Sequence, residues 1–131
     1  MKDILVPISP GELLDKITIL RIKSARMSDA AKVTNVRLEL SLLEQTWKEA
    51  VGSADVGDDE RALQAVNERL WAIEDDIRDK EMAQAFDARF IELARSVYIE
   101  NDERAAIKKR VNVKLGSRIV EEKSYKPYRP A

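Results

Sequence analysis

PISPGELLDK, residues 7–16, is the stretch that decides where the helical fold begins. Ser9 is followed by a proline and, three residues later, by Glu12, which makes a capping box with proline at the first helical position. Ile8 and Leu13 flank this box at the spacing of a hydrophobic staple. A phosphate-binding loop would need more glycines, with a lysine and a serine or threonine in P-loop spacing, and these are missing. The stretch therefore predicts the start of a helix rather than a ligand loop.

Apolar residues repeat at steps of three and four along most of the chain, which is typical of amphipathic helices. Polar caps and a glycine mark where these helices start and stop. The predicted helices run over residues 10–27, from a cap at Asp29 to about residue 51, from a cap at Asp58 or Asp59 to a turn near residues 83–87, and from a cap at Asp87 to residue 115, before Gly116. The sequence therefore predicts an all-α fold, an antiparallel bundle of about four helices in a single domain over residues 1–131.

The two ends of the chain differ from this helical body. The segment before the first helix contains a short β-prone run, ILVPI, at residues 4–8. Ile119 and Val120 offer it a partner, so a two-stranded pairing of the terminal segments is predicted as an accessory to the bundle. Residues from about 117 to 131 are otherwise expected to form an irregular basic tail.

Composition limits the chemistry that the chain can perform. Among its 131 residues there is no histidine and no cysteine, so the commonest general base, the commonest metal ligand and any thiol nucleophile are lacking. We expect no metal, no cofactor and no catalytic residue. No apolar run is long enough to cross a membrane and no secretory signal precedes the fold, so a cytoplasmic location is predicted.

The net charge of −1 hides an asymmetry along the chain. Residues 104–131 hold nine basic residues against two acids, a charge of +7, which leaves −8 for residues 1–103. A basic end can bind an anionic partner, but no aromatic residues alternate with this run to stack on bases. Nucleic-acid binding is therefore not expected. The cations are interpreted as partners for the helix C-terminus and for the acidic body.

Several polar residues project into the apolar faces of the third and fourth predicted helices at about 100° per residue. The candidate site residues are Asn67, Glu74, Arg78, Tyr98, Asn101, Arg104, Lys108 and Asn112. A charge that is buried without a partner is costly, so these side chains must be paired, hydrated or bound to a ligand. Glu74 is expected to face Arg104 or Lys108 across the helix pair.

Three interpretations of these residues stay open. They can form a structural network that sets how the helices pack. They can line a polar groove between the third and fourth helices that binds a small anionic ligand, with Arg104 and Lys108 as anion contacts and Glu74 as acceptor or base. They can also lie in a dimer interface. The acidic run IEDDIRDKE, residues 73–81, is interpreted as a solvated helix face because adjacent acids point in different directions.

Five blocks in a fixed order resemble a small bacterial family of unknown function. They are ILVPISPGELLDKITIL, NVRLELSLLE, AVNERLWAIEDDIR, FIELARSVYIENDERAAIKKRVN and LGSRIVEEKSY, and they cover nearly the whole chain. This resemblance implies a stand-alone helical protein and no particular activity. A second stretch, ELLDKITILRIKSARM, is similar to the first long helix of all-helical chorismate mutases, although its arginine spacing does not match theirs.

Taken together, the sequence predicts a noncatalytic binding or assembly module that forms a homodimer. The alternative is a protein that binds a small anionic metabolite, or an enzyme of electrostatic type, in the polar groove between the third and fourth helices.

Overall fold

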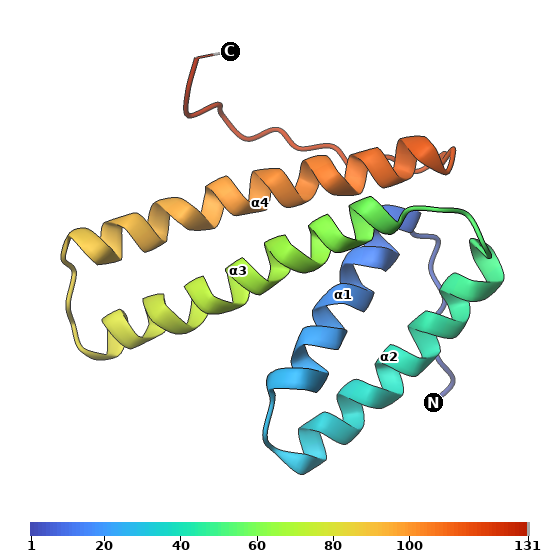
Figure 1. Ribbon diagram of the computed structural model, residues 1–131, viewed down its shortest axis with the longest axis horizontal. Coiled ribbons are helices and arrows are strands. Elements are labelled where there is room, and N and C mark those ends of the chain that lie inside the picture. Colours follow the sequence, from blue (N-terminus) through green and yellow to red (C-terminus); the bar gives the residue numbers. More distant parts are fainter. Residues whose placement is uncertain (131) are drawn as a thin grey trace.

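The computed structural model describes residues 1–130, in which it contains four helices and no strand. The helices are α1 (Pro10–Arg26), α2 (Ala30–Ala50), α3 (Gly57–Met82) and α4 (Ala88–Lys114). Consecutive helices form two antiparallel hairpins, α1–α2 and α3–α4, which diverge from the region where α1 begins (Figure 1). The predicted all-α fold with four helices is confirmed.

Side-chain caps start three of the helices where the sequence placed them. Ser9 Oγ accepts a hydrogen bond from the Glu12 N–H at 3.2 Å, and Asp29 and Asp87 cap α2 and α4 in the same way. At the end of α4, Gly116 has a φ of 66°. Its N–H and that of the following residue bond back into the last turn, which makes a Schellman motif.

The predicted cap of α3 is wrong. The helix starts at Gly57 without a side-chain cap, and Asp59 is instead buried against the end of α4. Its Oδ1 accepts from Arg110 Nε at 3.1 Å, and its Oδ2 lies 2.8 Å from Lys114 Nζ. Burial alone would raise the pKa of Asp59, but the two cations outweigh it and hold the pKa below its usual value. Asp59 therefore forms ion pairs with a distant helix instead of capping its own helix.

Helix α1 is central because it packs against all three other helices. Leu13 and Ile17 are buried one turn apart on this helix. Leu14, on another side of the same helix, is fully buried in the main core cluster with residues of α3 and α4. A helix that is covered on more than one side must be apolar on more than one side. Helix α2, in contrast, has no fully buried residue.

The first turn of α1 touches the backbone of α4 at Gly11. A Cβ atom placed on Gly11 would lie 2.4 Å from the Lys108 carbonyl oxygen, so any side chain there would force the two helices apart. The Gly11 N–H, which has no partner within its own helix, donates to Asn112 Oδ1 at 2.7 Å. The absence of a side chain at this one position therefore permits the crossing of α1 over α4.

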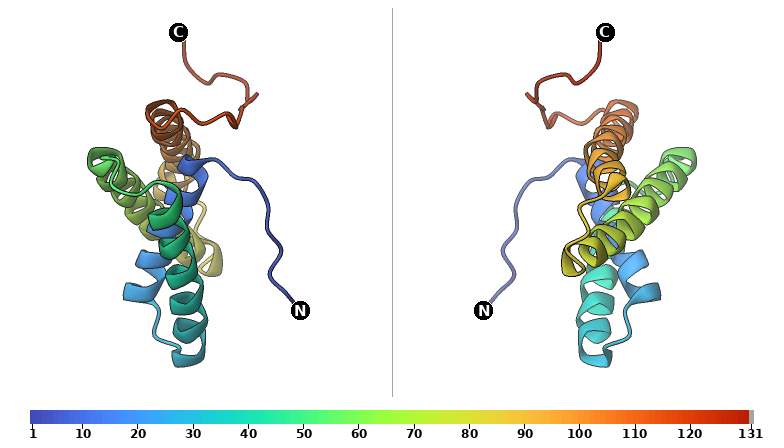
Figure 2. Two further views of the ribbon diagram at one scale, coloured as in Figure 1. Left: turned by 90° about the vertical axis from the view of Figure 1, so that its right-hand side faces the viewer. Right: turned by 90° about the vertical axis from the view of Figure 1, so that its left-hand side faces the viewer.

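The predicted pairing of the terminal segments is wrong, since neither segment forms a strand. Residues 1–8 are an extended arm that leaves the helices, whereas residues 117–130 run back beside α4 (Figure 2). Two contacts hold this tail against α4. Glu121 pairs with Lys108, and the ring of Tyr128 lies 4.9 Å from that of Tyr98. Both partners belong to α4, so the tail follows this helix away from the arm.

Each helix in the part of the chain that the structure describes is too short or too polar to span a bilayer.

Replacing Gly11 with alanine should lower the free energy of unfolding by about 1–3 kcal/mol, because the new methyl group overlaps the α4 backbone. Helix propensity alone predicts the opposite sign, a gain of about 0.8–1.0 kcal/mol. Chemical denaturation measures the change.

The matched control is Gly57→Ala in the first turn of α3. Its Cβ would meet only the ends of flexible side chains, so the free energy of unfolding should fall little or rise. Equal stability of Gly11→Ala and the unsubstituted chain would contradict the crossing.

Candidate functional site

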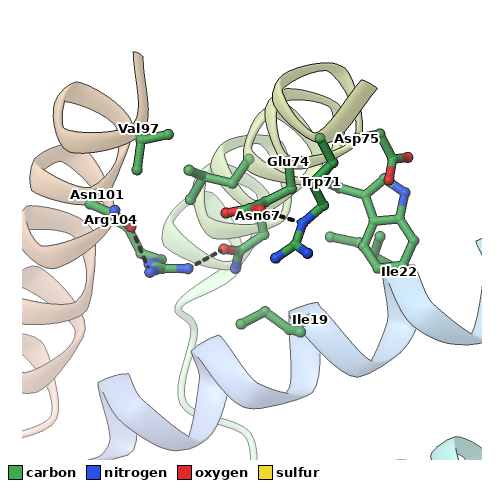
Figure 3. A pocket seen from close by; sticks show the side chains of 11 residues that line it. Ile19, Ile22, Asn67, Trp71, Glu74, Asp75, Val97, Asn101 and Arg104 are labelled. Carbon is green, nitrogen blue, oxygen red and sulfur yellow. Dashed lines mark hydrogen bonds and ion pairs between the residues drawn. The ribbon is translucent and has the colours of Figure 1, made fainter. Parts of the chain in front are cut away.

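A groove of about 430 Å³ opens where the two hairpins diverge. It is lined by α1, α3 and α4, and Figure 3 shows the residues that face it. The lining residues are Ile19, Ile22, Asn67, Leu70, Trp71, Glu74, Asp75, Arg78, Val97, Asn101 and Arg104. The groove thus combines an apolar surface with a few charged and amide side chains, the composition that is typical of small-molecule sites.

Arg104 is the half-buried cation of this groove. Its Nη1 donates to Asn67 Oδ1 at 3.1 Å and its Nη2 to Asn101 Oδ1 at 2.7 Å, as Figure 3 shows. Both acceptors are neutral amides, and no carboxylate among residues 1–130 forms an ion pair with the guanidinium. A guanidinium carries five N–H donors, so Arg104 keeps donors and its full positive charge for another partner.

Asn67 holds Arg104 in place from α3. It is only 4% exposed, and its Nδ2 donates to Asp15 Oδ1 at 2.8 Å and to Thr18 Oγ1 at 2.9 Å. Because its Oδ1 accepts from Arg104, the side chain links α1, α3 and α4 in a single chain of hydrogen bonds. Both hydrogen bonds that Asn67 Nδ2 can donate are formed within the protein. Asn67 therefore positions the Arg104 side chain rather than contacting a ligand through its amide N–H groups.

Glu74 pairs within its own helix. Glu74 accepts from Arg78 Nε at 3.1 Å, one turn along α3, and makes no contact with Arg104 or Lys108 across the helix pair. Both members of this pair are more than half exposed, so they contribute little to stability. They do neutralise each other at the outer part of the groove.

Lys108 lies outside the groove, one turn beyond Arg104 on α4. Its Nζ is 2.6 Å from Glu12, 3.9 Å from Asp15 and 3.1 Å from Glu121 of the tail. Burial favours the neutral amine, but the two hydrogen-bonded glutamates and the charge of Asp15 outweigh it and hold the pKa of Lys108 above its usual value. Lys108 therefore forms ion pairs with three carboxylates, whereas Arg104 forms none with a carboxylate of the described residues.

The structure places the eight candidate site residues partly in this groove and partly outside it. Five of them line the groove: Asn67, Glu74, Arg78, Asn101 and Arg104. The other three do not. Asn112 caps the Gly11 N–H, the ring of Tyr98 packs at a tilt against that of Tyr128 in the tail, and Lys108 pairs with the three carboxylates described above.

Sequence reasoning included no residue of α1 among the candidates, although this helix forms one side of the groove. Ile19 and Ile22 form one wall, while Asp15 and Thr18 hold Asn67 from below. A signal for them exists, since apolar residues occur on nearly every side of this helix, which is typical of a helix covered by several neighbours. Trp71 of α3 is half-buried and also lines the groove.

Fold and groove together define a small all-α protein with an open, partly apolar groove, in which Arg104 forms no ion pair with a carboxylate of the described residues. The chain belongs to DUF6165, a family of unknown function, whose profile matches residues 4–129. No curated protein and no solved structure matches the chain.

Acidification should release the tail from α4 while the helices stay folded. The hydrogen bond to Lys108 lowers the pKa of Glu121 below its ordinary value of 4.5. This contact therefore stabilises the docked tail fully above pH 4.5 and is lost as the pH falls through the lowered pKa. Heteronuclear NMR relaxation of residues 117–125 measures the release.

Glu121→Gln should make the tail mobile already at neutral pH, because it removes the charge that binds Lys108. Glu122→Gln is the control, since the neighbouring side chain is exposed and forms no ion pair within residues 1–130. If both variants behave alike, the contact between Glu121 and Lys108 does not hold the tail.

Proposed function

We propose that this protein is a noncatalytic binding module that holds a small carboxylate with an apolar or aromatic body in the groove between its two hairpins. The observation that carries this proposal is Arg104, a half-buried guanidinium that is oriented by two amide oxygens and paired with no carboxylate of the described chain. Protein sites that leave a cation unpaired and pre-oriented are suited to bidentate contacts with a carboxylate.

The shape and lining of the groove favour an apolar body on that carboxylate. Leu70 of α3 lines the same space as Arg104. Figure 3 shows that Trp71 of α3 and Val97 of α4 also face it, with Ile19 and Ile22 on the side of α1. A volume of about 430 Å³ suits a small molecule rather than a polymer. A ligand with one ring or a short alkyl chain would cover these apolar side chains while its carboxylate reaches the guanidinium.

The charges along the groove favour a single negative charge on the ligand. Arg78 is already paired with Glu74, and Asp75 is a further exposed acid on the same helix. A second carboxylate on the ligand would meet these acids instead of another free cation. Dianions are therefore expected to bind more weakly than monoanions of the same size.

Binding without catalysis is supported by the arrangement of the reactive groups. The two carboxylates of the groove are both exposed, and one of them is engaged in an ion pair with Arg78. Neither lies beside a hydroxyl that it could activate as a nucleophile among the groove residues. Bacterial origin and a cytoplasmic location stay predictions from the sequence.

Phenylacetate should raise the melting temperature of the protein, and phenylacetamide, which has the same shape without the charge, should not. Arg104→Gln should weaken phenylacetate binding by about 10- to 100-fold, the worth of a charge-assisted hydrogen bond. Glutamine can still bond to the amides of Asn67 and Asn101, so the fold should persist. Thermal shift and calorimetric titration measure both effects.

Arg95→Gln is the matched control, since Arg95 is an exposed arginine of α4 that does not line the groove. This variant should bind phenylacetate like the unsubstituted chain. The proposal fails if Arg104→Gln and Arg95→Gln respond to phenylacetate in the same way, or if the amide stabilises the protein as well as the acid does.

A further inference from the structure

The N-terminal arm, residues 1–8, is the most exposed apolar segment of the described chain. Ile4, Leu5 and Val6 are 77%, 91% and 66% exposed, and Ile8 is 39% exposed. Figure 2 shows that the arm leaves the start of α1 and runs clear of the helices. Large apolar side chains that follow one another in an exposed extended segment mark a surface that packs against something else.

A second groove, which we call the arm groove, opens at the base of the arm. It has a volume of about 490 Å³ and lies between the first turn of α1, the end of α2 and the residues just after α4. Its walls are Val6, Ile8, Ser9, Pro10, Leu13, Thr46, Ala50, Val51, Leu115 and Ser117. Most of these side chains are apolar, so the arm groove can receive residues such as Ile4 and Leu5.

The exposed area of the chain shows how much surface is left for a partner. The chain exposes 9440 Å². A compact monomer of 14.9 kDa is expected to expose about 7,000 Å², roughly a quarter less than this chain exposes. A standard protein interface covers about 800 Å² on each partner, so the excess is large enough for a stable dimer.

We propose that two copies of this chain form a homodimer by exchanging their arms, each arm packing Ile4 and Leu5 into the arm groove of the other copy. The arm and the arm groove adjoin each other, since Val6 and Ile8 belong to both. A single two-fold axis beside this patch therefore places each arm against the arm groove of the other copy. Such a reciprocal contact is what an isologous interface requires. The dimer does not depend on the Arg104 groove, whose lining residues are all different.

The backbone of the arm gives a second reason for a partner. Within the described chain, no N–H group of residues 1–8 donates to a backbone carbonyl, because the arm forms neither a strand nor a turn. The partner copy can supply hydrogen-bond partners to these groups where each arm lies against it. The β-prone run that fails to pair within the chain is thus well suited to pair between chains.

Sedimentation equilibrium tests the dimer directly. The unsubstituted chain should have a mass twice that of the 14.9 kDa monomer, and Leu5→Glu should weaken dimerisation by more than about tenfold, because the charge cannot enter an apolar groove. Leu5 is 91% exposed in the single chain, so this substitution cannot disturb the monomer fold.

Ile91→Glu is the matched control, an exposed leucine-sized residue at the far end of α4 from the arm groove. It should leave the dimer intact. A monomeric unsubstituted chain at high micromolar concentration overturns the proposal. So does a dimer that Leu5→Glu leaves intact or that Ile91→Glu dissociates, since the contact would then lie elsewhere.

Introduced cysteines distinguish exchange between chains from folding back within one chain, because the natural sequence contains no cysteine. A chain with both Leu5→Cys and Ala50→Cys should form a covalent dimer under mild oxidation, and Leu5→Cys alone should form little. A disulfide closed within one chain shows that the arm occupies its own groove and overturns the proposal. The absence of any disulfide in the double variant overturns it as well.

Discussion

The missing side chain at Gly11 is the constraint on which the rest of the structure depends. It lets α1 begin in direct contact with the backbone of α4, where Asn112 receives the free N–H. From that fixed start, α1 runs across the α3–α4 hairpin. Asp15 and Thr18 follow within two turns and meet Asn67 on α3. The angle between the hairpins, and the groove within it, follow from this crossing.

Two cations on neighbouring turns of α4 differ in their partners. Lys108 is surrounded by three carboxylates from α1 and the tail, and its charge is fully used in holding these parts together. Arg104 meets only amide oxygens, although Asp15 lies just beyond Asn67. The amide of Asn67 therefore separates a structural ion cluster from a free cation. This separation is the reason for assigning ligand binding to one of these residues and not to the other.

Local signals predicted most of the fold, and long-range contacts account for what they missed. Ser9, Asp29 and Asp87 act as caps because each needs only the next turn of its own helix. Asp59 has the same local pattern but lies within reach of two cations of α4, which no local pattern reveals. The candidate site was predicted in part for a similar reason. Spacing placed Arg104 and Asn67 on inward faces, but the wall from α1 depends on a crossing that the spacing does not encode.

The central claim is that Arg104 is held ready for a carboxylate in an open groove. A crystal structure of the protein grown with phenylacetate tests it most directly. We predict that the carboxylate lies within hydrogen-bond distance of the Arg104 guanidinium, with the ring against Trp71 and Leu70 and with Asn67 still bonded to Asp15. An Arg104 side chain that instead turns to pair with Glu74 or Asp75 and closes an empty groove would contradict the account.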